Sequence, residues 1–282
     1  MKTTILTDSA ALLPTRLSTA TNLKILQIPF TLADQTYYPD QDASVAQLAN
    51  LQEQAADSLT EAPISLPKIT ALLTDLQAEG YTDVICIHLA EALSGLGANL
   101  RQAVKKASVP LNLHLLDSYS LGAAEGNLVV AAAQLIDQGQ EPADIVAHLK
   151  KLRHRQHTLL IMDDLKNLRK TGSIARTSRH LENTLLHRKS LLHFTKNGDL
   201  EVLLTSSRTK KILQNVQQRL SDLTAYARPQ HLSLVTEDPE ALADYTAELQ
   251  AVLPSAQLNS QLSSPTIFAF MGPQTLLLSW SE

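Results

Sequence analysis

The sequence has few of the residues that mark several protein classes. Among its 282 residues are one cysteine, Cys86, one tryptophan and four phenylalanines. A single cysteine excludes an internal disulfide framework, and its place in an apolar run is typical of a packed core position. No apolar run reaches the roughly 18 residues of a membrane span, and the first residues lack the apolar stretch of a signal peptide. The sequence therefore predicts a cytoplasmic protein without stable membrane insertion.

Charge is unevenly distributed along the chain. The net charge is only −4, yet residues 150–211 contain 15 lysines and arginines against five acidic residues, and the rest of the chain is acidic. Such a segment can attract an acidic partner or a phosphate, although a solvated helical surface looks the same in sequence. Phe194 is its only aromatic residue other than histidine, and base stacking needs more, so we expect no binding of nucleic acid.

The length and the order of apolar segments predict an α/β protein of two domains. We place the domains at residues 1–152 and 153–282, with the linker between Gly139 and His157, because cores rarely grow beyond about 250 residues. The first is expected to have a Rossmann-like, mostly parallel sheet with flanking helices, and the second an α+β fold. A cleft between the two domains is the natural place for a ligand.

Short apolar runs and longer segments of helical spacing alternate in the first half. We expect strands at Thr4–Thr7, Ile25–Leu32, Val84–His88 and Leu111–Leu116, and helices at Val45–Leu59, Leu66–Ala78, Gly95–Ala107 and Gly122–Gln138. Gly139 is expected to end the last of these helices.

In the second half the expected strands and helices follow one another in a less regular order. We expect helices at Pro142–Lys151, Asp164–Arg169, Ser207–Tyr226 and Pro239–Val252, and strands at Thr158–Met162, Leu191–Thr195, Leu200–Leu204, Leu232–Val235, Ile267–Phe270 and Thr275–Trp280. Asn197-Gly198 predicts a hairpin between two of these strands. The serine-rich stretch Asn259–Pro265 is interpreted as a loop.

The junction between the expected strand at Val84–His88 and the next helix has the clearest chemical meaning. Ser94 and Gly95 stand where a tight turn presents backbone N–H groups and a hydroxyl, a suitable cradle for a carboxylate or phosphate. Asp8 and Ser9 follow another strand of the same sheet, so the two polar groups are expected to line one crevice. Each of these residues could also serve only as a cap or turn residue.

Several catalytic motifs are incomplete around this junction. Leu100 replaces the third glycine of a dinucleotide-binding fingerprint, and no P-loop lysine follows. A nucleophile elbow needs glycine where Ala92 stands. The closest histidine pair, His154 and His157, lies in a basic run without an acidic or cysteine partner nearby, so no metal site is expected.

Motifs along nearly the whole chain resemble those of the DegV family, bacterial proteins that bind a fatty acid between two α/β domains. The motifs are I-L-T-D-S at 5–9, I-P-F at 28–30, Y-Y-P-D at 37–40, I-S-L-P at 64–67, L-S-G-L at 93–96, L-D-S at 116–118, G-N-L-V at 126–129, D-D-L-K-N-L-R-K-T-G-S-I at 163–174, N-G-D-L at 197–200, S-R-T at 207–209 and M-G-P at 271–273. Each motif is short, but their shared order makes the resemblance specific.

The resemblance implies a carrier protein that is not an enzyme and needs no cofactor. An acyl chain would lie in an apolar tunnel between the domains, with its carboxylate held near Ser65, Ser94 and Gly95, and a separate fatty acid kinase would act on it. Each buried methylene would contribute roughly 0.8 kcal/mol. Arg208 matches a family position, and Arg176 or Arg179 would supply positive charge toward the carboxylate or an acidic partner.

Three positions depart from the family pattern at the carboxylate end. Ile64 stands in place of threonine, Leu96 in place of threonine and Phe270 in place of histidine. One reading is that the remaining serines still hold a fatty acid. Another is that the pocket takes a less polar lipid or is vestigial, and the protein acts as an interaction or regulatory protein. A third, a hydrolase or transferase using Ser94, lacks an identifiable base.

Overall fold

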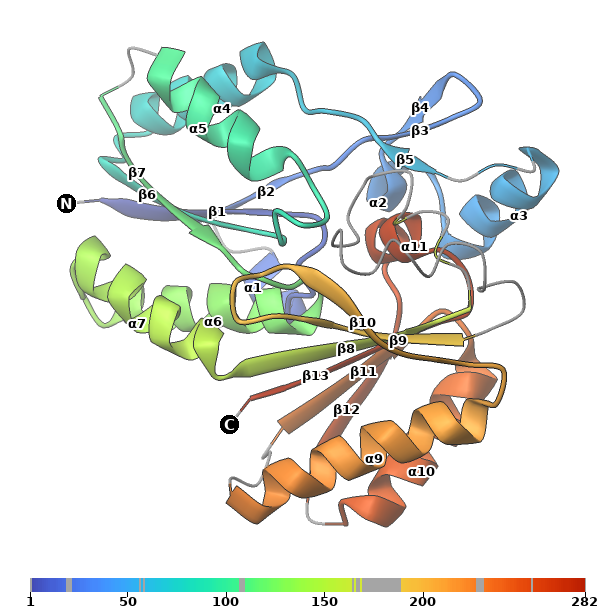
Figure 1. The fold of residues 1–282 in the computed structure, drawn as a ribbon. Coiled ribbons are helices and arrows are strands. Elements are labelled where there is room, and N and C mark those ends of the chain that lie inside the picture. The colour runs from blue at the N-terminus through green and yellow to red at the C-terminus, as the bar shows by residue number, and fades with distance from the viewer. Residues whose placement is uncertain are drawn as a thin grey trace.

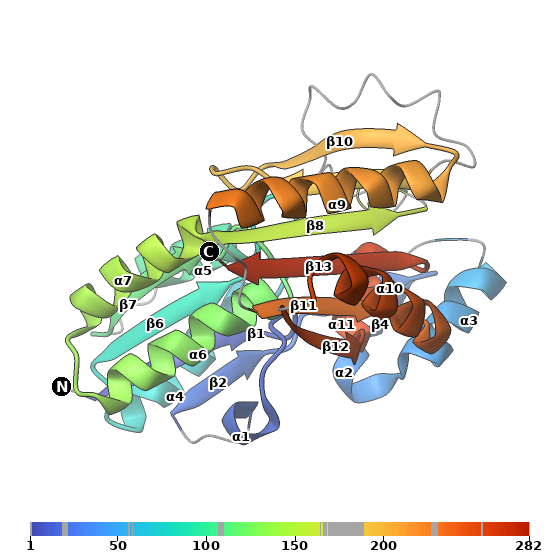
Figure 2. The same cartoon turned by 90° about the horizontal axis from the view of Figure 1, so that it is seen from below.

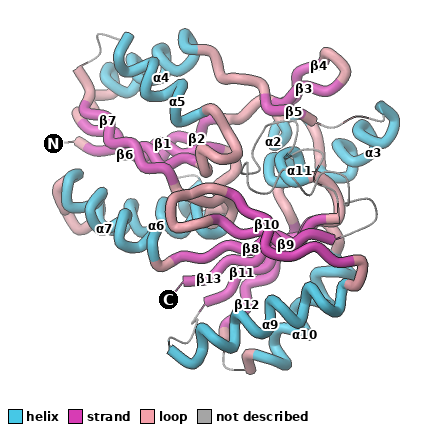
Figure 3. The backbone as a smooth tube through the Cα atoms, viewed as in Figure 1, coloured by secondary structure: helices cyan, strands magenta, loops and turns pink. Residues whose placement is uncertain are grey.

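The computed structural model describes residues 2–18, 22–55, 57, 59–106, 110–163, 165, 168, 189–226, 231–254 and 256–281. Two large sheets with helices packed on them make up most of this structure, and a small third sheet lies beside them (Figure 1). The tube view distinguishes the helices from the strands of all three sheets by colour (Figure 3).

The first large sheet is fully parallel, as the sequence predicts. It is formed by β1 (Thr3–Asp8), β2 (Leu23–Leu26), β6 (Asp83–His88) and β7 (Asn112–Asp117) in the order β2-β1-β6-β7. Its helices are α1 (Thr15–Ser18), α4 (Leu66–Ala78), α5 (Leu96–Lys106), α6 (Ala123–Asp137) and α7 (Pro142–His154).

Alternation along the strands explains why helices cover both faces of this sheet. Leu6 and Cys86 belong to the apolar cluster that includes residues of α4 and α5. Ile5 and Ile85 belong to the cluster that includes residues of α6 and α7. The burial of strands on both sides is what a run such as Val84–His88 predicts.

The small antiparallel sheet contains β3 (Phe30–Leu32), β4 (Gln35–Tyr37) and β5 (Thr60–Glu61) in the order β4-β3-β5. Around it lie α2 (Pro39–Asp42), α3 (Val45–Ala55) and α11 (Pro265–Met271), so that the end of the chain packs against its beginning. The single strand expected at Ile25–Leu32 is therefore wrong: Pro29 lies between two strands of different sheets, and a proline cannot donate to a ladder.

The second large sheet is mixed. Its order is β10-β9-β8-β13-β11-β12, and all its pairs are antiparallel except β11 with β12. The strands are β8 (Gln156–Met162), β9 (Lys189–Phe194), β10 (Leu200–Ser206), β11 (His231–Thr236), β12 (Gln257–Leu262) and β13 (Thr275–Ser281). The expected hairpin between β9 and β10 is confirmed.

The two faces of the mixed sheet have different neighbours. Helices α9 (Thr209–Tyr226) and α10 (Pro239–Val252) cover one face, where Leu159 and Leu278 are buried. On the other face, Leu160 and Leu277 belong to the same apolar cluster as Phe268 of α11. Figure 2 shows the two large sheets side by side, with α6 lying close to both.

Local signals predicted several element ends correctly. Helices α4 and α10 have the expected bounds, and α6 ends just before Gly139, whose φ of 74° requires the left-handed backbone that glycine adopts readily.

Other expected elements were wrong. Ile267–Phe270 is helical rather than extended: the Ser264 hydroxyl caps α11, whose every residue from Thr266 to Met271 is buried. In a short run that is buried throughout, the sequence does not show whether apolar residues recur at the spacing of a helix or of a strand. The expected loop at Asn259–Pro265 begins with strand residues of β12, and the helix expected to reach Leu59 ends at Ala55. The short helix at Asp164–Arg169 falls mainly outside the described residues.

The expected linker between Gly139 and His157 contains α7, which contacts strands β6 and β7 of one large sheet and β8 of the other. The boundary at residues 152 and 153 stays a prediction. In the part of the chain that the structure describes, no helix is both long enough and apolar enough to cross a membrane.

Candidate functional site

The Ser94–Gly95 turn lies between the end of β6 and the first residue of α5. Ser94 is 7% exposed. Its Oγ accepts a hydrogen bond of 3.0 Å from the Leu96 backbone N–H and donates one of 2.5 Å to Glu61 Oε1. We call the Ser94 hydroxyl and the Gly95 backbone N–H the cradle. The sequence analysis expects this turn to hold a carboxylate or phosphate of a ligand, and that role stays a prediction.

The carboxyl group in the cradle belongs to the chain itself. Glu61 ends strand β5 and reaches the turn from the small sheet. Burial raises the pKa of Glu61 to about 7, while hydrogen bonds from the Ser94 hydroxyl and the Gly95 backbone N–H lower it and the charge of Asp8 raises it. Glu61 is therefore a site residue that the sequence analysis missed.

Asp8 is completely buried at the end of β1. Its Oδ1 accepts from the Ala10 N–H and its Oδ2 from the Leu89 N–H, both at 2.9 Å, so it ties the end of β1 to the segment that follows β6. Burial raises the pKa of Asp8 to about 6 against these two hydrogen bonds. The buried Glu125 contacts it, and burial together with the Asp8 charge raises the pKa of Glu125 well above its ordinary value.

Ser9 connects the first half of the chain to α11. Its Oγ accepts from the Ile28 N–H at 3.1 Å and lies 3.1 Å from Thr266 Oγ1. Thr266 is fully buried and donates to Asp40 Oδ2 at 2.5 Å. The structure thus uses the polar groups of Asp8 and Ser9 in internal contacts, and a ligand-binding role for either stays a prediction.

Ser65 is exposed and caps a helix. Its Oγ accepts a 3.4 Å hydrogen bond from the Lys68 backbone N–H at the start of α4. This is the common function of a serine followed by proline at the start of a helix.

The three apolar departures from the family pattern lie in one buried cluster. Ile64, Leu96 and Phe270 are 4%, 2% and 3% exposed. Phe270 packs edge to face on Phe30, with ring centroids 4.8 Å apart. All three side chains thus contribute to the apolar core rather than offering polar groups to a ligand.

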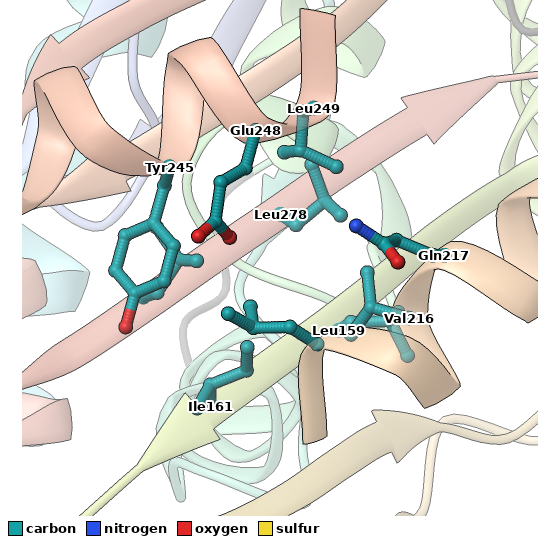
Figure 4. A pocket seen from close by; sticks show the side chains of 10 residues that line it. Leu159, Ile161, Val216, Gln217, Tyr245, Glu248, Leu249 and Leu278 are labelled. Atoms are coloured by element: carbon teal, nitrogen blue, oxygen red, sulfur yellow. The ribbon is translucent and has the colours of Figure 1, made fainter. Parts of the chain in front are cut away.

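Two cavities in the described part of the chain lie in the second half. One, between α9, α10 and the mixed sheet, has a volume of about 10 Å³, enough for about one water molecule (Figure 4). The other has a volume of about 300 Å³ and is lined by His157, Thr158, Leu159, His193, Phe194, Arg219 and Trp280. Neither is lined by a residue that the sequence predicts for a lipid head group.

The predicted partner-binding arginines are only partly described. Arg208 is exposed, just before α9, and its backbone N–H donates to Ser206 Oγ at 3.0 Å. Arg176 and Arg179 lie outside the described residues.

Pattern reasoning offered no signal for Glu61 or Glu125. Glu61 lies in a two-residue strand, too short for any periodicity. Glu125 is a lone acid in the first turn of α6, a place that acids commonly occupy at the surface. Only the tertiary structure brings these carboxyl groups to the ends of β1 and β6.

The chain matches curated sequences and solved structures over nearly their whole length. A DegV domain-containing protein of Staphylococcus aureus (strain COL) is 29% identical over 290 residues, covering 99% of this chain and 97% of that protein. The crystal structure of the fatty acid binding DegV family protein SAG1342 from Streptococcus agalactiae superimposes with a TM-score of 0.88 at 22% identity, covering 100% and 99% of the two chains.

The name of a further solved structure mentions both a kinase and a bound ligand. The Streptococcus pneumoniae Fatty Acid Kinase (Fak) B3 protein, loaded with linoleic acid, superimposes with a TM-score of 0.80 at 20% identity, covering 100% of this chain and 99% of that one. The family model described as "Uncharacterised protein, DegV family" matches residues 2–282. Because this match spans nearly the whole chain, the chain belongs to the DegV family.

Proposed function

We propose that this protein is a non-catalytic carrier of a long-chain fatty acid, which it binds between its two halves with the carboxylate near Ser94 and Gly95. The observation that carries the proposal is the cradle: its hydroxyl and backbone N–H already bind a carboxyl group, that of Glu61. Solved relatives of the same fold are described as fatty acid binding or as loaded with linoleic acid.

The apolar cluster beside the cradle supports a lipid tail rather than a polar substrate. Ile64, Leu96 and Phe270 are buried in one apolar cluster, and Leu96 follows Ser94 and Gly95 directly in the chain. Each methylene of an acyl chain inserted there would contribute roughly 0.8 kcal/mol. Insertion requires these side chains to separate, with Ser65 at the entrance and Asp8 and Ser9 behind the cradle.

The partner is proposed to be a separate cytoplasmic kinase subunit that phosphorylates the presented carboxylate. The support is the description of the pneumococcal relative as a fatty acid kinase B protein. Arg176, Arg179 and Arg208 would bind acidic groups of that partner, because they belong to the basic segment of an otherwise acidic chain. No cofactor is part of the proposal.

Lipid extraction tests the carrier function directly. Organic solvent should remove a stoichiometric fatty acid of 14 to 20 carbons from the purified protein, identified by mass spectrometry, and added oleate should raise the melting temperature of the delipidated protein. An empty extract together with no thermal shift would contradict the proposal.

The second candidate is an interaction or regulatory protein with a closed pocket. The tight packing of Phe270 on Phe30, where the family has a polar side chain, favours it. Such a protein would bind its partner equally well before and after delipidation.

A further inference from the structure

The cradle has no donor to spare in the structure. The Ser94 hydroxyl carries one hydrogen, which it donates to Glu61 Oε1 at 2.5 Å. The Gly95 backbone N–H also hydrogen-bonds the Glu61 carboxyl group. The next amide, Leu96 N–H, donates to Ser94 Oγ at 3.0 Å. An incoming carboxylate would therefore compete with Glu61 for the same donors.

Charge adds to this competition. A second carboxylate within a few ångströms of an ionised Glu61 would face like-charge repulsion in a poorly solvated place. Two carboxyl groups so close are stable when they share one proton, because the protonated group then donates to the ionised one.

The surroundings of Glu61 supply little positive charge. β3 and α11, the elements packed against β5, contain no ionisable side chain. From β1 the Asp8 carboxyl adds negative charge, and Asp40 on α2 is hydrogen-bonded to Thr266.

The first cation along each of the helices α4 and α5 has another partner. Arg101 of α5 forms hydrogen bonds of 2.5 and 2.8 Å with Glu91, and Lys68 of α4 lies over the Tyr38 ring. A proton is then the available way to neutralise Glu61 in the described part of the chain.

We propose that Glu61 is an internal competitor for the lipid site, so that a fatty acid carboxylate enters the cradle only when Glu61 takes up a proton. This inference rests on the carrier function proposed above. It makes binding of one fatty acid anion accompany the uptake of one proton from water, and it makes Glu61 the residue that discriminates between charged and uncharged head groups. A long-chain alcohol carries no charge and can donate a hydrogen bond to Glu61, so its binding does not require protonation of Glu61.

The test compares wild type with Glu61→Gln in the delipidated full-length protein. Glutamine keeps the shape and the acceptor oxygen but removes the charge and offers an N–H to the ligand. Oleate binding is measured by titration calorimetry at pH 6 and pH 8, below the concentration at which oleate forms micelles. Glu53→Gln, an exposed change of the same type on α3, is the matched control.

The size of the expected effect follows from the ionisation of Glu61. With its pKa at about 7, a site that binds only when this group is protonated weakens about tenfold at pH 8 and less than twofold at pH 6. Glu61→Gln should therefore bind oleate about tenfold more tightly than wild type at pH 8 and nearly equally at pH 6. Oleyl alcohol should bind the variant no more tightly than it binds wild type.

The outcomes separate the two proposals. Equal oleate affinity of wild type and Glu61→Gln at pH 8 overturns the competitor role while the carrier function stands. No oleate binding by either protein at either pH overturns the carrier function. Binding by the variant alone at pH 8 supports the competitor role.

A second measurement needs no variant. Wild-type titrations at pH 8 in two buffers of different ionisation enthalpy report the protons taken up with each oleate. About one proton is expected, and none would overturn the inference even if Glu61→Gln failed to fold.

Discussion

Asp8 and Glu61 are both carboxyl groups at the ends of strands whose pKa values burial raises, yet their surroundings differ in kind. Asp8 is completely buried and accepts from two backbone N–H groups, those of Ala10 and Leu89, which no rotation can withdraw. Glu61 is only partly buried and depends on the Ser94 hydroxyl, which can turn, and on the Gly95 N–H.

This difference indicates which of the two carboxyl groups a ligand carboxylate can displace. Removing Asp8 would strand two backbone donors in the core, whereas the donors beside Glu61 can accept another carboxylate in its place. Asp8 therefore holds the fold together, and Glu61 is suited to exchange with a ligand.

The largest expected effect is that of Asp8→Ala on stability. We expect the free energy of unfolding to fall by about 3 kcal/mol, because two buried N–H groups lose their acceptor. Urea unfolding measures it, with the exposed Asp75→Ala on α4 as the control, expected to change stability by less than about 0.5 kcal/mol. Equal effects of the two substitutions would contradict a role of Asp8 in holding the fold together.

The next effect concerns pH. The folded protein binds protons on both carboxyl groups more tightly than the unfolded chain, because their pKa values rise from 3.8 to about 6 for Asp8 and from 4.5 to about 7 for Glu61. Their contribution thus favours folding at low pH and is lost as pH rises through these ranges.

Between pH 5 and 7.5 we expect a loss of about 2 kcal/mol for wild type, allowing for the partial exposure of Glu61. Glu61→Gln should lose the part due to Glu61 and keep the parts due to Asp8 and Glu125, whose pKa values are also raised. Urea unfolding at several pH values tests this, and a variant profile that follows wild type above pH 6 would show that Glu61 is not the titrating group.

The smallest effects compare two serines that each precede a helix. Ser94→Ala should cost about 1.5 kcal/mol, since it removes a bond to Glu61 and strands the Leu96 N–H. Ser65→Ala should cost about 0.5 kcal/mol, because its cap is exposed and its hydrogen bond is 3.4 Å long. Oleate affinity should fall more for Ser94→Ala. A larger fall for Ser65→Ala would move the head group to the start of α4.

The sequence predicted most of the fold because the signals were local. Apolar residues at helical spacing placed α4 within its observed bounds, the helix expected at Pro239–Val252 also has its observed bounds, and the glycine after α6 marked its end. Local reasoning was wrong for α11, where the residues from Thr266 to Met271 are buried on every side and their period carries no information. It also missed β12, a polar edge strand whose exposed residues resemble a loop.

For the candidate site, the sequence offered a hypothesis about one turn, and its role in binding a ligand stays a prediction. The Ser94–Gly95 turn was identified as a carboxylate cradle from its own residues, because a hydroxyl and a free N–H at the start of a helix have a fixed chemistry. Its occupant was missed, because Glu61 is separated from Ser94 by 33 positions and reaches it from another sheet.

By itself the sequence determined the family, through the order of its motifs, and the parallel sheet of the first half, through its short apolar runs. It also determined the chemical groups of the cradle, because these belong to neighbouring residues of one turn. Only the tertiary structure decided what the cradle holds and which carboxyl groups are buried. Those properties depend on contacts between β1, β5, α5 and α11, and the environment that shifts the pKa of a carboxyl group exists only after distant segments have packed together.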